Sequence, residues 1–550
     1  MRWCVLFLAS TGLFLRAEER WLSAKSAPFE VMSNAGDRAI RDKLAYLEQF
    51  QEAFAVIVGK KDLHLLWPLR VVVMKGAQES QIALGRDSYI ISAPESGVFS
   101  TAFRKQLARM LLEANTNRMP ESVENGLIAL FSTLDVEGTH ITLGLAVPPP
   151  ERNRDWARMH LLTVKPDYAG RTRVFINNLE QGGDFELAYR NAYQKTQAEI
   201  EKQIDAYMQS SNFGATLVSA KPLNANRDIR PAEVEGDGGK VALADLLLAA
   251  DSPDAGSAYE KLKGLGADEG KALVALKNDK EPEAKELLDG VVEGDSKSAR
   301  AWLEFGLLQA GPAKAKICFE TAARLNPFWG EPYRQLALLE DDLNVQIKLL
   351  KKATAVEPRN IGYWQTLAKV DVAANNYVEA QKAWAGAERA GASPDERLRM
   401  QELRLKAEGQ RADFAESEKK RIAKEEADDL SRVKAESEAA IHAAEAAANK
   451  QLNPEGKPVP KPTEWWNGDG IASKLEGSVK RLDCLGTSAR LAVEASDGKL
   501  VELLVTDPAQ LMKTLSCGVQ KTGRPVLVQY TARADAKFHT AGDVTAIEFH

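Results

Sequence analysis

Residues 301–327 read AWLEFGLLQAGPAKAKICFETAARLNP, a helical stretch with a tight turn at Gly311 and Pro312. Its landmark residues return along the chain at an interval of 31 residues. The recurring positions are Trp302, Tyr333 and Trp364, together with Pro327 and Pro358, which close the first two units. A fixed interval of this length predicts tandem helical hairpins that stack into one solenoid.

These units resemble tetratricopeptide repeats, in which small residues lie where two helices cross and large residues fill the gap between neighbours. The matching positions are Trp302, Gly306, Ala315, Phe319, Ala322 and Pro327 in the first unit, Tyr333, Leu336, Ala337, Ala353 and Pro358 in the second, and Trp364, Leu367, Ala368, Asn376, Tyr377, Ala380, Trp384 and Ala387 in the third. A degenerate unit with Ala284, Leu288 and Val291 precedes them. The resemblance implies a solenoid over 241–396 that binds a protein or peptide partner.

The chain has 550 residues, of which 44% are hydrophobic and 27% are charged, and its net charge is -6. This length predicts three or four domains. The small net negative charge argues against a protein that binds nucleic acid through basic patches.

Residues 1–17 read MRWCVLFLASTGLFLRA and are typical of a cleavable signal peptide, so we expect a secreted or periplasmic protein. An uncleaved membrane tether is the alternative. In an oxidising compartment Cys484 and Cys517 should form a disulfide, which stabilises a small domain by about 3 kcal/mol. Cys318 lies on an apolar helical face and should be buried.

Residues 18–222 mix strand and helix patterns and predict an α+β domain. FEVMS at 29–33 and LRVVVMKG at 69–76 read as strands, and apolar residues recur at helical spacing from Asp37 to Val58. The polar, glycine-rich span 223–240 reads as a linker to the solenoid.

Residues 103–132, FRKQLARMLLEANTNRMPESVENGLIALFS, carry the next resemblance together with the opening stretch from Trp21 to Ser33. The domain is similar to the peptidase-MA, gluzincin-like domains of secreted bacterial tetratricopeptide-repeat proteins. Active members have H-E-x-x-H on one helix and an E-G-L segment on the next. Two histidines one turn apart share a zinc ion, and the glutamate serves as general base.

None of those ligands stands in the matching positions of this chain. The first motif falls on Lys105, Gln106 and Arg109, and the third-ligand position falls on Asn125, next to Glu124. Cationic side chains repel a metal dication rather than bind it. The resemblance therefore implies a pseudo-peptidase with no metal and no cofactor.

The remaining histidines offer little to rebuild such a site. His140 and His160 share the domain, but no HxH, HxxxH or CxxC pair exists, and nucleophile-elbow and phosphate-loop motifs are absent from the sequence. A residual or atypical metal-dependent peptidase or hydrolase stays the alternative function.

The C-terminal third contains three further segments. Residues 397–451 predict a long charged helix whose thin apolar stripe could seat it on the repeats or on a second copy of the chain. Residues 452–464 are a proline-rich linker. Five strand patterns in 465–550, with a hairpin turn at Asp497-Gly498, predict a small β-barrel.

Together these features predict an extracytoplasmic, non-catalytic interaction scaffold. Its parts are an inactive peptidase-like domain, helical repeats with a protein or peptide partner, a long charged helix that permits self-association, and a barrel stapled by a disulfide.

Overall fold

The computed structural model describes residues 20–219, 223–452, 471–509 and 511–550. The predicted signal peptide and almost all of the proline-rich linker lie outside these residues. The chain divides into two compact units, Met1–Glu425 and Glu426–His550. Each unit is described by itself.

A six-stranded sheet in the order β4-β5-β3-β2-β1-β9 forms the centre of the N-terminal domain. Its strands are β1 Leu22–Ser26, β2 Phe29–Ser33, β3 Leu69–Met74, β4 Ala83–Leu84, β5 Tyr89–Pro94 and β9 Ala232–Glu233. Strands β2, β3 and β5 are parallel, and β1 pairs with β2 as an antiparallel hairpin. Parallel strands need helices on both faces, which explains the continuous apolar run of β3.

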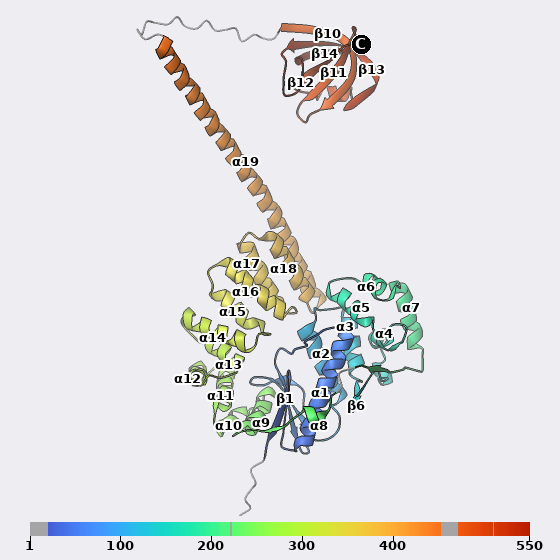
Figure 1. The fold of residues 1–550 in the computed structure, drawn as a ribbon, viewed down its shortest axis with the longest axis vertical. Coiled ribbons are helices and arrows are strands. Elements are labelled where there is room, and N and C mark those ends of the chain that lie inside the picture. The colour runs from blue at the N-terminus through green and yellow to red at the C-terminus, as the bar shows by residue number, and fades with distance from the viewer. Residues whose placement is uncertain (1–19, 220–222, 453–470, 510) are drawn as a thin grey trace, which may run out of the picture. The chain divides into compact units, whose positions relative to one another are not determined.

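Helices surround this sheet (Figure 1). The first eight are α1 Asp37–Val58, α2 Thr101–Asn115, α3 Glu121–Phe131, α4 Arg154–Val164, α5 Thr172–Glu180, α6 Phe185–Tyr193, α7 Gln197–Met208 and α8 Ala225–Asp228, with a 3-10 turn at Pro149–Glu151. Val71 and Val73 belong to the core that α1 shares, whereas Val72 packs on the opposite face. A second, small sheet contains β6 Asp135–Glu137, β7 His140–Leu143 and β8 Thr216–Val218.

The predicted linker at 223–240 contains structure that its polar composition did not indicate. Strand β9 pairs with β1 at the sheet edge, and α9 Gly238–Ala249 packs on the face of the sheet that carries Val72. A Cβ on Gly239 would lie 2.2 Å from the Trp21 ring, so only glycine allows this close approach. The boundary between the predicted domain and the predicted repeats is thus filled by elements of the sheet domain.

The repeat region is a run of antiparallel helical hairpins. Its helices are α10 Ala255–Glu260, α11 Leu265–Lys277, α12 Glu281–Glu293, α13 Ala299–Leu307, α14 Pro312–Leu325, α15 Gly330–Leu339, α16 Leu343–Val356, α17 Ile361–Ala373 and α18 Tyr377–Ala390. Trp302 donates its indole N–H to the carbonyl of Ser296 at 2.8 Å, and Trp364 donates to the carbonyl of Pro358 at the same distance. The tryptophans of the first and third units thus make equivalent contacts with the turn that precedes them.

Small residues lie where these helices cross, as the repeat pattern requires. Ala315, Ala322 and Ala380 are buried, and a Cβ on Gly306 would lie 2.6 Å from the Phe319 ring. Cys318 is buried with a free thiol, as predicted. The chain therefore contains tetratricopeptide-like helical repeats.

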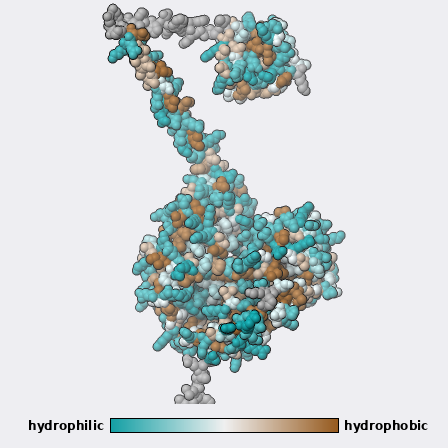
Figure 2. All heavy atoms as spheres, viewed as in Figure 1, coloured by the Kyte–Doolittle hydropathy of each residue, from teal (hydrophilic) through white to brown (hydrophobic). Residues whose placement is uncertain are grey.

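Helix α19, Pro394–Leu452, follows the last hairpin. Its first turns bury Met400 and Ala407 against the last hairpin, and Phe414 lies 5.1 Å from Tyr377 between ring centroids. The later turns are exposed and mostly hydrophilic, with hydrophobic residues spaced along them (Figure 2). Within the described part of the chain, no helix has the length and apolarity that a bilayer crossing demands.

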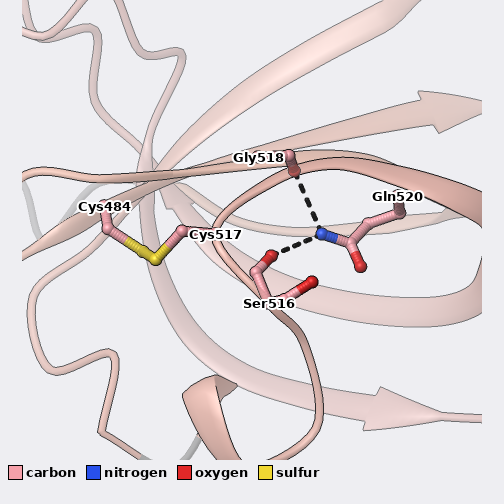
Figure 3. The surroundings of a disulfide bond; sticks show 5 residues. All are labelled: Cys484, Ser516, Cys517, Gly518 and Gln520. Atoms are coloured by element: carbon pink, nitrogen blue, oxygen red, sulfur yellow. Dashed lines mark hydrogen bonds between the residues drawn. A yellow bond between two sulfur atoms is a disulfide. The ribbon is translucent and has the colours of Figure 1, made fainter.

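The C-terminal strands form a closed barrel in the order β10-β11-β12-β14-β13. They are β10 Ile471–Cys484, β11 Ala489–Ala495, β12 Leu500–Val505, β13 Gly518–Ala532 and β14 Asp543–Phe549, with a 3-10 turn at Leu511–Lys513. Cys484 at the end of β10 is bonded to Cys517 just before β13, which confirms the predicted disulfide (Figure 3). Gln520 braces the same corner by donating to the carbonyls of Ser516 and Gly518.

Candidate functional site

The positions that match the peptidase motif make contacts of a structural kind. Lys105 on α2 forms an ion pair with Glu151 at 2.6 Å. The side-chain amide of Gln106 accepts from the backbone N–H of Ile82 and donates to its carbonyl, at 3.1 and 2.6 Å. The amide of Gln106 therefore makes the same two hydrogen bonds with the backbone of Ile82, next to β4, that a neighbouring strand would make. Both ends of its amide are engaged by these two bonds.

Arg109 and Asn125, the other two positions, are exposed. The glycine after Asn125 has a packing role, because a Cβ on Gly126 would lie 2.3 Å from the carbonyl oxygen of Asp155 on α4. The glycine of the E-G-L-like segment thus allows α3 and α4 to touch backbone to backbone.

His140 and His160 do not meet as a metal site. His140 is exposed on β7, whereas His160 is fully buried on α4. Both ring nitrogens of His160 are engaged, Nδ1 with the Tyr207 hydroxyl at 2.8 Å and Nε2 with the carbonyl of Gly144 at 2.7 Å. Burial lowers the pKa of His160. Over the described ranges, no three His, Cys, Asp or Glu side chains cluster as metal ligands.

A different site lies where the repeats meet the sheet domain. The turns that join one hairpin to the next all lie on one edge of the solenoid, and four successive turns contact the domain. The contacts are Arg300 Nη1 to the carbonyl of Gly85 at 2.8 Å, Asn326 Nδ2 to the carbonyl of Leu66 at 2.8 Å, Arg359 to the α2–α3 connection, and Arg118 Nε to the carbonyl of Ala390 at 3.1 Å. We call this the docking edge.

Of the four residues that make these contacts, Arg359 forms the largest number of hydrogen bonds. Its guanidinium donates to the carbonyl and hydroxyl of Thr116, at 2.9 and 2.7 Å, and to the carbonyl of Asn117 at 3.2 Å. It also forms an ion pair with Glu124 at 2.8 Å, and only 8% of the Arg359 side chain and 14% of the Glu124 side chain are exposed. The carboxylate of Glu124, next to Asn125, thus binds a cationic side chain of the solenoid.

Two cavities open along the docking edge, and together we call them the junction groove. The larger has a volume of about 570 Å³ and the smaller about 360 Å³. His64, Leu65, Leu66 and Phe328 line both. The larger cavity is mainly apolar, with Phe29, Leu63, Trp67, Pro68, Leu325 and Pro327 among its lining residues.

An aromatic pair divides the two cavities. The rings of His64 and Phe328 stack with centroids 4.1 Å apart, and Phe328 keeps 42% of its surface exposed. Asn115 fixes the backbone of His64 by accepting from its N–H at 3.0 Å and donating to its carbonyl at 2.8 Å. Burial lowers the pKa of His64, so its ring is neutral near pH 7 and offers an apolar face.

The smaller cavity carries more charge. Glu113, Arg118, Glu357 and Arg359 line it. Burial raises the pKa of Glu357, which accepts from the backbone N–H of Gly330 at 2.5 Å. The junction groove therefore joins an apolar pocket to a polar one, as recognition sites for side chains commonly do.

Buried ion pairs contribute to the wall of the larger cavity, whose lining residues include Glu30, Arg70 and Asp87. Arg70 pairs with Glu30, Asp87 and Asp245 at 2.8 to 3.1 Å, and Arg86 bridges Asp245 to Glu269 of the first hairpin. Although burial alone would raise the pKa of Asp87, Arg70 and Arg86 hold it well below its usual range. Each carboxylate has a cationic partner, which is what a buried charge requires.

The 31-residue pattern of the sequence predicts the repeats, but it does not predict the junction groove. The one available signal is the aromatic pair Phe328-Trp329, which directly follows the closing proline of the first unit. Trp329 packs edge-on against Trp67 with ring centroids 4.8 Å apart. An aromatic pair at a repeat turn, where polar residues are usual, points to a second surface beyond the solenoid.

No protein-family model and no curated protein matches this chain. Several solved structures match part of it. MamA is 20% identical over 30% of this chain and 97% of its own, with a TM-score of 0.24. YrrB, described as a TPR protein with an unusual peptide-binding site, is 16% identical over 30% of this chain and 93% of its own, with a TM-score of 0.26.

A thermophilic TPR protein from Thermus thermophilus, TTC0263, is 19% identical over 31% of this chain and all of its own, with a TM-score of 0.24. Overlaps of this size do not define an activity. The helical repeats are defined instead by the 31-residue spacing of their landmark residues and by their packing in this chain.

Proposed function

We propose that this protein is a non-catalytic interaction scaffold that binds a protein or peptide partner by taking an apolar side chain into the junction groove. The observation that carries this proposal is the apolar cavity of about 570 Å³, which the sheet domain and the repeat turns build together. Cavities of this size, with an apolar floor and a few polar groups at one end, suit anchor side chains.

The peptidase-like domain serves this scaffold as a support with no reaction of its own. Its motif positions hold Lys105 and Gln106, whose polar groups are engaged with Glu151 and Ile82. Its Glu124 carboxylate is engaged by the solenoid through Arg359. The resemblance to gluzincins thus concerns the arrangement of helices, while the ligand positions have taken on packing tasks.

The protein would work outside the cytoplasm. The Cys484–Cys517 disulfide supports this location, because such bonds persist in oxidising compartments. N-terminal sequencing of the mature protein from its native host tests it. A mature chain that starts just after Ala17 agrees with secretion, and an intact N-terminus on a membrane-bound protein supports the tether instead.

Binding to the groove can be tested with a pair of matched variants. Peptides selected from a random library on the wild-type protein are measured by fluorescence polarisation against Phe328→Glu and Ile317→Glu. Both residues are exposed and apolar, at 42% and 60%, but only Phe328 lines the groove. We expect at least a tenfold loss of affinity in Phe328→Glu alone, since a charge would enter an apolar cavity.

Equal affinity of the selected peptides for both variants would place the binding surface elsewhere. A peptidase assay with and without added Zn²⁺ belongs to the same experiment. Turnover that disappears on chelation would favour the residual-hydrolase alternative. Self-association through α19 needs no ligand in the groove and forms a separate proposal.

A further inference from the structure

Helix α19 continues far beyond the hairpin on which it begins. Every residue from Lys419 to Leu452 is exposed. This part of the helix gains no stability from packing against the other described residues, although tertiary packing usually supplies most of the stability of a helix. Its exposed turns are therefore available to a second molecule.

The apolar residues of this exposed part follow an 11-residue period. Ile422, Val433 and Ala444 form one series, and Leu430, Ile441 and Leu452 form a second. The exposed fractions of the large ones run from 47% for Ile422 to 83% for Leu452. An 11-residue period corresponds to 3.67 residues per turn, so both series stay on one side of the helix. We call this side the α19 stripe.

The stripe begins only where α19 has left the repeats. Traced towards the N-terminus at the same interval, its two series reach the charged residues Arg411 and Lys419. Met400, which is buried on the last hairpin, lies on the first series two periods before Ile422, whereas Ala407 and Leu405 are outside both series, and 55% of Leu405 is exposed. The first series thus meets the repeats at Met400, but the repeats cover none of its residues from Ile422 onward, as is expected if a second surface covers the later turns.

Charges along the exposed part come in alternating blocks. Residues 419–424 hold four cationic side chains, residues 425–429 hold four acidic ones, and Arg432 and Lys434 are followed by Glu436 and Glu438. Two such helices in parallel, in-register contact would place each block beside its own like charge. Like charges at that range destabilise pairing, whereas opposite charges on facing helices select the orientation.

We propose that α19 pairs in antiparallel fashion with α19 of a second copy of this chain, with the two-fold axis between Ser431 and Arg432. In this register Leu430 faces Val433 of the second copy and Ile422 faces Ile441. The interface is isologous, so these contacts occur twice.

The same register relieves most of the charge repulsion. Asp429 lies opposite Lys434, and the cationic block lies opposite residues 439–444, which carry no acidic or strongly basic side chain. Glu425 facing Glu438 is the one like-charged pairing that remains among these blocks. Parallel pairing in register would instead oppose every charge of the blocks to itself, so the antiparallel arrangement is favoured.

Sedimentation velocity of the full-length protein over a range of concentrations tests the pairing. We expect a concentration-dependent dimer that Leu430→Glu/Val433→Glu abolishes. Leu405→Glu is the matched control, because it adds a charge at an exposed leucine of the same helix outside the stripe. A protein that stays monomeric at every concentration, or a control that dissociates as fully as the stripe variant, overturns the proposal.

Cysteine cross-linking distinguishes the orientation. Glu426 faces Ser437 of the second copy, and the two positions lie about 16 Å apart along their own helix, too far to form a disulfide within one chain. Oxidation of Glu426→Cys/Ser437→Cys should give a covalent dimer, whereas Ala444→Cys, opposite Lys419, should not. A covalent dimer from Ala444→Cys, whose two copies meet only in parallel, in-register pairing, or the absence of one from the double variant would overturn the antiparallel register.

The native cysteines do not interfere with this readout when Cys4 is replaced by serine in every variant. Cys484 and Cys517 are already bonded to each other, and Cys318 is buried. Phe328→Glu should dimerise like the wild type, since the groove and the stripe lie on different elements. Loss of peptide binding and loss of pairing are therefore separable outcomes.

Discussion

Replacing Arg359 with alanine would remove the central contact of the docking edge. The change deletes an ion pair with Glu124 at 2.8 Å and the bonds to Thr116 and Asn117, and it leaves a mostly buried carboxylate without its cation. Breaking a buried pair from one side costs about 3 to 5 kcal/mol. Glu124 still accepts from the N–H of Met119 at 2.8 Å, so the expected cost is at the lower end of this range, about 3 kcal/mol.

A loss of about 3 kcal/mol is roughly a hundredfold change in an equilibrium constant. We expect the first thermal unfolding transition to fall by roughly 5 to 10 °C. Hydrogen exchange should also rise at the repeat turns near Asn326 and Arg359, because these turns would leave the domain more often. Differential scanning fluorimetry and exchange mass spectrometry measure the two effects.

Arg389→Ala provides the control, since Arg389 is an exposed arginine near the same edge whose guanidinium donates to the carbonyl of Ala385 within its own helix. Glu124→Gln/Arg359→Met removes both charges and should recover part of the lost stability. The reasoning is refuted if Arg359→Ala and Arg389→Ala unfold at the same temperature, or if the double variant is less stable than the single one.

Three further predictions concern single features. Gly126→Ala should cost about 3 kcal/mol in urea unfolding, because its Cβ would meet the Asp155 carbonyl oxygen at 2.3 Å, whereas Gly290→Ala, with open space around it, should be neutral or stabilising. Burial lowers the pKa of His64, so the unfolded chain binds a proton at a higher pH than the folded protein does. The free energy of unfolding should therefore have its full value above about pH 6.5 and decrease below it. His64→Gln should show a smaller decrease of the urea midpoint between pH 7.5 and 5 than the wild type. Cys484→Ser/Cys517→Ser should destabilise the barrel by about 3 to 4 kcal/mol, as expected for a closed loop of 33 residues, and an unchanged near-UV melting curve would contradict this.

The repeats, the long helix and the strands of the barrel could be predicted because each has a recognisable residue pattern within one continuous stretch of sequence. A 31-residue interval fixes the tryptophans and prolines, and a run of helix-forming charged residues fixes α19. The disulfide could be predicted for a similar reason, since only two cysteines occur in the C-terminal module.

The junction groove could not be predicted, because it depends on contacts between residues more than 200 positions apart. Asn326 bonds to Leu66, and Arg359 bonds to Thr116. The same limit explains α9, whose polar approach at 223–237 suggested a linker although its apolar residues complete the second face of the sheet. Glu124 is the clearest example, because its partner Arg359 is distant in the sequence and could be identified only from the folded structure.

The docking edge also limits which changes in repeat number this protein can tolerate during evolution. Phe328, Arg359 and Ala390 occupy one position in three successive units, and each contacts its own residues of the sheet domain: Phe328 stacks on His64, Arg359 bonds to Thr116, Asn117 and Glu124, and Ala390 accepts from Arg118. Free-standing solenoids can gain or lose a unit by duplication or deletion. Here an added unit would move every later turn by the length of one hairpin, so each turn would face the contact surface of the turn next to it. The number of hairpins is therefore constrained by the sheet domain on which they pack.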